Sequence, residues 1–164
     1  MKNQERTIGI IMAIIISVAM GIVASVVVSR NPGAKLPPFP IFCLINVAES
    51  VVVGIIAALL IPLGKLGHML TVKAKATPPS LKFTLLNSLP MAVGYSVIVS
   101  AIISFINVAQ AHSKIPAEQA PPLFAMWFGS WGPLLIPSIL ISYVLSILLA
   151  PIVVRAVMGK GGPN

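Results

Sequence analysis

Residues 7–29 read TIGIIMAIIISVAMGIVASVVVS and contain no charged side chain. A helix needs about 20 largely apolar residues to cross a hydrocarbon core about 30 Å thick, so this stretch is long enough to span a membrane. Three later stretches have the same apolar character: 40–63, 83–109 and 132–154. Transmembrane barrels instead show alternating segments of about 10 residues. The sequence therefore predicts an all-α membrane protein with four transmembrane helices.

The composition of the whole chain agrees with this class. Hydrophobic residues make up 57% of the 164 residues and charged residues only 9%, against roughly 25% charged residues in an ordinary soluble domain. The mean hydropathy is +1.02. The first apolar run exceeds the usual 7 to 15 residues of a signal peptide, so we expect a retained first helix. We treat residues 1–164 as a single membrane domain.

The net charge of +8 is spread unevenly between the two ends of the predicted helices. Eight basic residues fall on the side of the N-terminus, and the other side carries three, Arg30, Lys35 and Lys114. The eight are Lys2, Arg6, Lys65, Lys73, Lys75, Lys82, Arg155 and Lys160. The positive-inside rule then places both termini and residues 64–82 in the cytoplasm of a multi-pass inner-membrane protein. Because these bases are scattered beside few aromatic residues, we expect no nucleic-acid partner.

An internal repeat is visible when the chain is compared with itself. Over the fourteen positions 12–25, a shift of 79 residues superposes five identical pairs: Met12 on Met91, Ala13 on Ala92, Ser17 on Ser96, Val18 on Val97 and Ser25 on Ser104. Spans two and four end alike, in LLIP at 59–62 and LLAP at 148–151, a shift of 89. The sequence predicts two duplicated parallel hairpins, 7–63 and 83–157, joined by a basic cytoplasmic linker at 64–82.

Small residues recur every fourth position in spans one and three. The first stripe is Ala13, Ser17, Gly21 and Ser25, and the second stripe is Ala92, Ser96, Ser100 and Ser104. Such a stripe lets two helix backbones approach closely, since lipid supplies no hydrophobic drive for association. We therefore expect spans one and three to meet at the centre of a four-helix bundle.

Residues 123–131, which contain Trp127 and Trp131, precede Gly132 and Pro133. Tryptophan is enriched at the membrane interface, so this stretch is expected to be an outer amphipathic lead-in to span four. Re-entrant insertion is the alternative.

Glu49 is the candidate functional residue. The other two acidic residues, Glu5 and Glu118, lie outside the predicted spans, whereas Glu49 falls about ten residues into span two, near the bilayer midplane. Asn46 and Ser50 lie beside it on the same helix. Two readings stay open: a neutral carboxyl that joins helices, or a proton- or cation-linked site, the usual role of intramembrane acids. Tyr95 and Tyr143, in spans three and four, are candidate hydroxyl partners for Glu49.

Other chemistry has little support in the sequence. The chain contains no aspartate, no second acid near Glu49 and no histidine pair with metal-ligand spacing, so we expect no catalytic residue, no metal site and no cofactor. Asn107, His112 and Ser113 form a candidate polar site at the outer end of span three. An exposed loop histidine is the alternative.

The second half of the chain resembles the two-helix bacterial membrane domains grouped as the uncharacterised family two-seven-nine-eight. The resemblance is carried by Met91, Ala92, Ser96, Ser104 and Asn107, by Trp127 or Trp131, and by the APIVVR ending at 150–155. The first half departs from the pattern at Glu49 and Lys65. The resemblance implies a tandem bacterial membrane domain, and it implies no activity.

Two functional hypotheses follow. The leading one is a transporter-like or channel-like protein, expected to form homo-oligomers because four helices have little room to enclose a pathway. Glu49, Asn46, Ser50, Tyr95 and Tyr143 would form its binding or coupling site. The alternative is a structural or accessory subunit that packs against the helices of a membrane partner.

Overall fold

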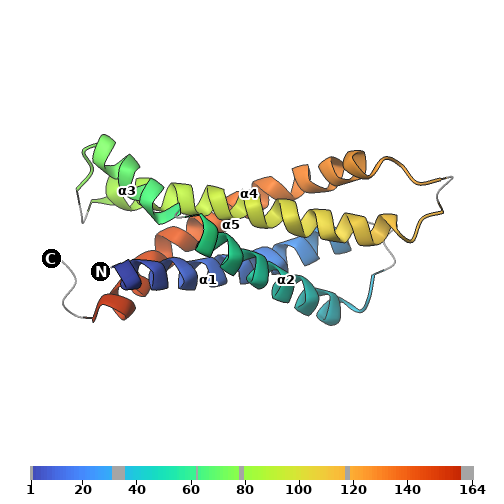
Figure 1. Ribbon diagram of the computed structural model, residues 1–164, viewed down its shortest axis with the longest axis horizontal. Coiled ribbons are helices and arrows are strands. Elements are labelled where there is room, and N and C mark those ends of the chain that lie inside the picture. Colours follow the sequence, from blue (N-terminus) through green and yellow to red (C-terminus); the bar gives the residue numbers. More distant parts are fainter. Residues whose placement is uncertain (1, 31–35, 62, 78–79, 117–118, 160–164) are drawn as a thin grey trace.

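The computed structural model describes residues 2–30, 36–61, 63–77, 80–116 and 119–159, which form five helices and no strand (Figure 1). The helices are α1 (Lys2–Ser29), α2 (Phe39–Leu60), α3 (Leu63–Lys73), α4 (Leu81–His112) and α5 (Leu123–Met158). α1, α2, α4 and α5 are long and apolar enough to cross a membrane. The predicted all-α class and the four apolar helices are confirmed.

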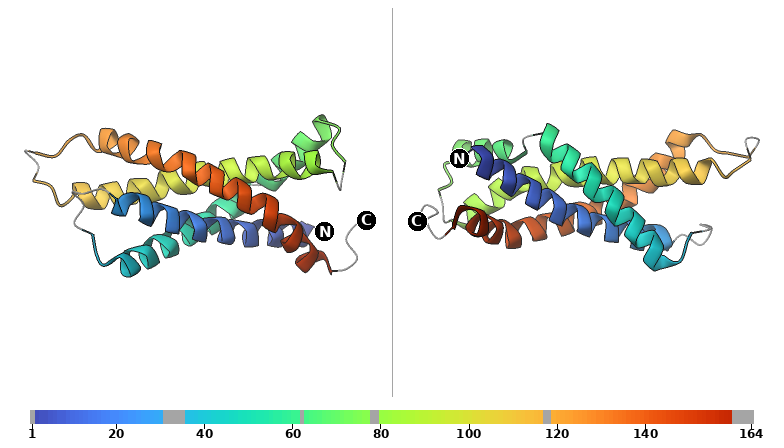
Figure 2. Two further views of the ribbon diagram at one scale, coloured as in Figure 1. Left: turned by 180° about the vertical axis from the view of Figure 1, so that it is seen from behind. Right: turned by 60° about the horizontal axis from the view of Figure 1, so that its bottom comes forward.

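α1 and α4 form the middle of an elongated bundle. Each of them packs against the other three long helices, and each buries 44% of its most apolar window, against 22% for α2 and α5. One end of the bundle contains the start of α1, the whole of α3 and the end of α5 (Figures 1 and 2). The expected contact between spans one and three is therefore present, as the contact between α1 and α4.

The small-residue stripes nevertheless form contacts within each hairpin, that is, between α1 and α2 and between α4 and α5. Gly21 of the first stripe lies against α2, where an added Cβ would come within 2.5 Å of the Val47 Cα atom. A Cβ on Gly54 of α2 would collide with the Ser17 side chain. In the second hairpin, the Ser96 hydroxyl of α4 donates to the Ser138 carbonyl of α5 over 3.2 Å. The close approach that the stripes allow thus joins α1 to α2 and α4 to α5.

Residues 64–82 were expected to be a linker, and the structure adds a helix there. α2 stops because Ile61 is extended (φ −118°, ψ 112°), as favoured for a residue that precedes a proline. α3 then packs on the beginning of α4, with Gly67 directly against the Asn87 backbone. Its 11 residues include two glycines, which weakens the helical signal in the sequence. Pro78 and Pro79 lie outside the described residues.

The boundary predicted at Gly132 and Pro133 is wrong, because α5 runs without a break from Leu123. Residues 123–131 are therefore the first turns of this helix, with no break before Gly132, and their position at the membrane interface stays a prediction. Pro133 and Pro137 lie inside the helix. Proline is tolerated within transmembrane helices when neighbouring groups satisfy the backbone that it frees. The exposed position of Pro133 also keeps its ring out of the helix contacts.

The two tryptophans attach this first part of α5 to α4. Trp127 Nε1 donates to the Ala101 carbonyl over 3.0 Å, and Trp131 Nε1 donates to Ser100 Oγ over 2.9 Å. The two indole rings stack, with centroids 5.6 Å apart and planes 10° from parallel. Aromatic rings with a bonded N–H are typical of membrane interfaces.

The outer faces of α2 and α5 are apolar and exposed. Their most exposed large side chains are Ile41, Leu44, Val52, Ile56 and Leu60 on α2 and Phe124, Ile136, Leu140, Leu148 and Ile152 on α5. An apolar surface of this extent is unfavourable in water. It fits a lipid bilayer, which agrees with the predicted membrane environment.

Candidate functional site

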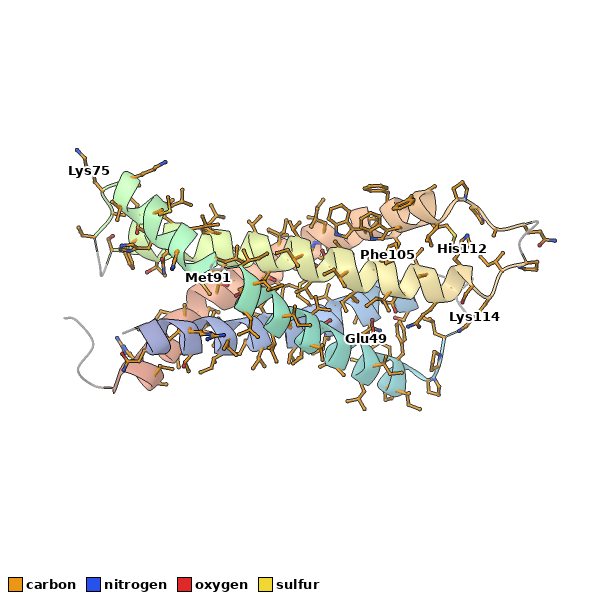
Figure 3. The ribbon with its side chains drawn as sticks, in the orientation of Figure 1. Glu49, Lys75, Met91, Phe105, His112 and Lys114 are labelled. Carbon is orange, nitrogen blue, oxygen red and sulfur yellow. The ribbon has the colours of Figure 1, made fainter. Side chains whose placement is uncertain are left out.

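Glu49 sits at the edge of the buried face of α2. Asn46 and Ser50 flank it in the chain and are fully buried, at 0% exposure, while Ile45 and Val52 on its other side are exposed. Glu49 itself is half-buried and lies at about the level of Phe105 along the bundle (Figure 3). The helical repeat of 3.6 residues places it at the border between the polar interior and the apolar outer face.

The carboxyl group of Glu49 lacks a hydrogen-bond partner at one oxygen. Its Oε2 atom is buried from solvent and has no hydrogen bond to any described residue. The hydroxyl of the adjacent Ser50 is in the same condition. Buried polar atoms are normally paired, and an unpaired one is costly in an apolar medium. Both groups are thus polar atoms enclosed in the bundle without a described hydrogen-bond partner.

An amide pair joins α2 to α4 one turn from Glu49. Asn107 Nδ2 donates to Asn46 Oδ1 over 2.8 Å, and Asn46 Nδ2 donates to the Phe42 carbonyl over 3.0 Å. The predicted outer site of Asn107, His112 and Ser113 is not brought together by these bonds. His112 Nε2 instead contacts the Pro121 carbonyl at 3.0 Å, and Ser113 Oγ donates to the Gln110 carbonyl.

Serines line the inner faces of all four long helices. The first and second stripes are buried throughout, and α5 adds Ser138, Ser142 and Ser146 at the same four-residue spacing. Several of these hydroxyls have no hydrogen-bond partner among the described residues, namely those of Ser17, Ser50, Ser104, Ser138 and Ser146. The α5 serines were missed in the sequence, although their spacing was the available signal.

The tyrosines do not complete the predicted site. The Tyr143 hydroxyl donates to the Leu85 carbonyl of α4 over 3.4 Å. Tyr95 is buried, with 2% of its surface exposed, in the apolar cluster around Met12, Ile16 and Val99. Within the part of the chain that the structure describes, no hydrogen bond joins either tyrosine to Glu49. The described arrangement brings together Glu49, Ser50, Asn46 and Asn107.

This arrangement limits the chemistry that the site can support. Across the described ranges, no three His, Cys, Asp or Glu side chains gather where they would hold a metal ion. One carboxyl with a neighbouring hydroxyl and amide oxygens suits the exchange of a proton or the binding of a monocation, since both need few charged ligands. Multi-carboxylate cages are instead typical of divalent ions.

A shallow apolar hollow lies on α5, and Glu49 does not line it. It is lined by Leu140, Ile141, Val144 and Leu145 on the outer face of α5. All four lining side chains are aliphatic, so the hollow offers contact to an apolar group and no polar recognition.

Comparisons with known proteins add no relative. No family model, no curated protein and no solved structure matches this chain. The resemblance to the two-helix family and the internal duplication therefore stay predictions.

Proposed function

We propose that this chain is a transporter-like or channel-like protein of a bacterial inner membrane, in which Glu49 binds a proton or a monovalent cation. The observation that carries the proposal is the buried Oε2 atom of Glu49, which has no partner among the described residues. A carboxyl that only joined helices would be bonded to one of them. Leaving an intramembrane acid unpaired is costly, and such a cost is typical of functional sites.

The protein works as an oligomer in this proposal. α1 and α2 are in backbone contact at Gly21, so there is no space for a pathway between them. Glu49 lies at the border of the exposed α2 face that carries Ile45, Val52 and Ile56. A second copy packed on this face would enclose Glu49 between two subunits, as closed twofold symmetry allows.

Both termini face the cytoplasm in this proposal, and the two hairpins descend from one duplicated unit. Support comes from the basic residues of α3 and the end of α5, which lie at the end of the bundle where α1 begins (Figure 1). Positive charge concentrated on one side marks the cytoplasmic side. The equivalent use of the two stripes, each within its own hairpin, supports the duplication.

The test is proton flux in reconstituted vesicles. The purified protein is placed in liposomes that contain a trapped pH dye, and a pH gradient is imposed. Glu49→Gln keeps the size of the side chain and removes its titration, so we expect it to abolish most of the wild-type flux. Ser146→Ala is the matched control, since it removes another unpartnered buried hydroxyl, on α5. Equal proton flux in Glu49→Gln and wild type contradicts the proposal. So does the absence of flux in both proteins when the assay is repeated with gradients of monovalent cations.

The second candidate function is an accessory subunit that binds a partner's transmembrane helix. The hollow on α5 favours the accessory role, because two of its lining residues, Leu140 and Val144, are 60% and 52% exposed and could contact a partner's helix. Leu140→Trp would fill the hollow and block such a helix. Loss of a co-purifying membrane protein in this variant, with proton flux absent from wild type, would select the accessory role.

A further inference from the structure

α3 has a buried side and an exposed side. Leu63, Gly67 and Thr71 are buried, one turn apart, and Gly67 is pressed against the Asn87 backbone of α4. The exposed side carries large apolar residues, namely Leu66, Met69, Leu70 and Val72. α3 is therefore fixed to the bundle along one edge while an apolar face remains uncovered by the described residues.

Four lysines surround that exposed face. They are Lys65, Lys73, Lys75 and Lys82, and all four side chains are exposed. The chain has no acidic residue between Glu49 and Glu118, so α3 and the α4 helix on which it packs contain no opposite charge. Lys82 Nζ also donates to the Ala74 carbonyl just after α3, over 2.9 Å. This end of the bundle thus concentrates positive charge beside exposed apolar side chains.

Lys75 occupies a backbone position that normally favours glycine. Its φ is +50°, and the amides around it close the end of α3. Lys75 N donates to the Val72 carbonyl, and Ala76 N donates to the Thr71 carbonyl. These two bonds form a Schellman motif, in which the left-handed residue is usually glycine because a Cβ is disfavoured there. At Lys75 a charged side chain thus occupies a position where a Cβ carries a backbone cost.

We propose that α3 and the four lysines around it, Lys65, Lys73, Lys75 and Lys82, form an interfacial anchor that binds the anionic lipid headgroups of the surrounding leaflet. Charge complementarity selects this occupant, because α3 and α4 contain no carboxylate beside the lysines and the anionic headgroups of a bilayer lie at the same depth as an interfacial helix. Leu66, Met69 and Leu70 enter the boundary between headgroups and acyl chains, and the lysine stems extend past them so that the ammonium groups reach the phosphates. The inference is independent of any transport by Glu49.

The test measures lipid enrichment around the full-length protein. The protein is reconstituted in bilayers of phosphatidylcholine with a minority of phosphatidylglycerol and extracted in detergent, and the bound lipids are quantified by mass spectrometry. We expect wild type to retain phosphatidylglycerol above its bulk fraction. Lys75→Gly should lower the affinity of the protein for phosphatidylglycerol about fivefold, which is the effect of one lysine near a charged surface. Raising the ionic strength should lower it as well.

The variants separate headgroup binding from net charge and from folding. Lys114→Gln removes a lysine at the opposite end of the bundle (Figure 3) and should leave the enrichment unchanged. Lys75→Gly also relieves the left-handed backbone, so its melting temperature in uncharged detergent should equal or exceed that of wild type. Lys65→Gln, at an exposed helical position, is the second variant if Lys75→Gly fails to fold. The proposal is overturned if Lys114→Gln loses as much phosphatidylglycerol as Lys75→Gly, or if Lys75→Gly and Lys65→Gln both keep the full enrichment. Selective binding of a short RNA instead of the lipid also overturns it.

Discussion

Asn107 of α4 donates a hydrogen bond to Asn46 of α2 over 2.8 Å, and this bond connects the two hairpins beside Glu49. Asn46 is fully buried, and its amide group also donates to the Phe42 carbonyl within its own helix. Because lipid offers no competing partner, a polar pair of this kind fixes how two helices are aligned. The amide pair thus sets the position of the α2 turn that carries Glu49.

Removing either amide should destabilise the bundle, and the two effects should not add. We expect Asn46→Ala and Asn107→Ala to show a coupling free energy of about 0.6 to 1.7 kcal/mol, from the average to the largest value measured for hydrogen bonds between membrane helices. A double-mutant cycle on unfolding in mixed micelles gives this value. Additive effects of the two substitutions would show that the pair contributes no specific contact.

The second prediction concerns the close packing of α1 on α2. Gly21→Ala places a Cβ against the Val47 backbone, so we expect a loss of about 1 to 3 kcal/mol, typical of an overpacked contact. Gly9→Ala is the matched control in the same helix, because open space surrounds that position. It should raise the stability by about 0.5 to 1 kcal/mol through helix propensity alone. Equal effects of the two substitutions on the free energy of unfolding would contradict the close contact.

The sequence predicts the long helices because their signal is local. Each apolar run exceeds the length of a membrane span, and no tertiary contact is needed to recognise it. The small-residue stripes are also visible, and their burial follows from the same argument. The sequence does not show which helix each stripe contacts, because a stripe indicates only that some helix backbone comes close. Gly21 lies against Val47, and Gly54 lies against Ser17, only because α1 and α2 cross at that level.

The misread segments depend on tertiary contacts. α3 is short and contains Gly64 and Gly67, so its helix is stabilised mainly by packing on α4 rather than by propensity. The interfacial position of Trp127 stays a prediction, but its bond to the Ala101 carbonyl, which holds the first turns of α5 against α4, has no signal in the sequence. The bond between Asn46 and Asn107 spans 61 residues, a separation at which a single sequence carries no pairing signal.

Glu49 offers a third prediction, which separates its two readings. A carboxyl that joined helices would stabilise the fold, whereas the unpaired Oε2 atom should destabilise it. We therefore expect Glu49→Leu to raise the free energy of unfolding by on the order of 1 kcal/mol, since it removes part of the cost of an acid in the membrane. Unfolding in mixed micelles measures the change. A loss of stability would instead assign Glu49 to helix association, and Ser50→Ala, which removes a neighbouring unpaired hydroxyl, should be close to neutral.

Membrane orientation is the last prediction, and it uses two exposed positions at opposite ends of the bundle. Thr77 follows α3 at the end near Lys75, and Ser113 lies between His112 and Lys114 at the other end (Figure 3). Cys43, the single cysteine, is first replaced by alanine. Because the basic end should be cytoplasmic, a membrane-impermeant thiol reagent applied to intact cells should label Ser113→Cys and leave Thr77→Cys unlabelled until the membrane is opened. The reverse pattern would place α3 and its lysines outside, and labelling of both positions in intact cells would mean that the chain inserts in two orientations.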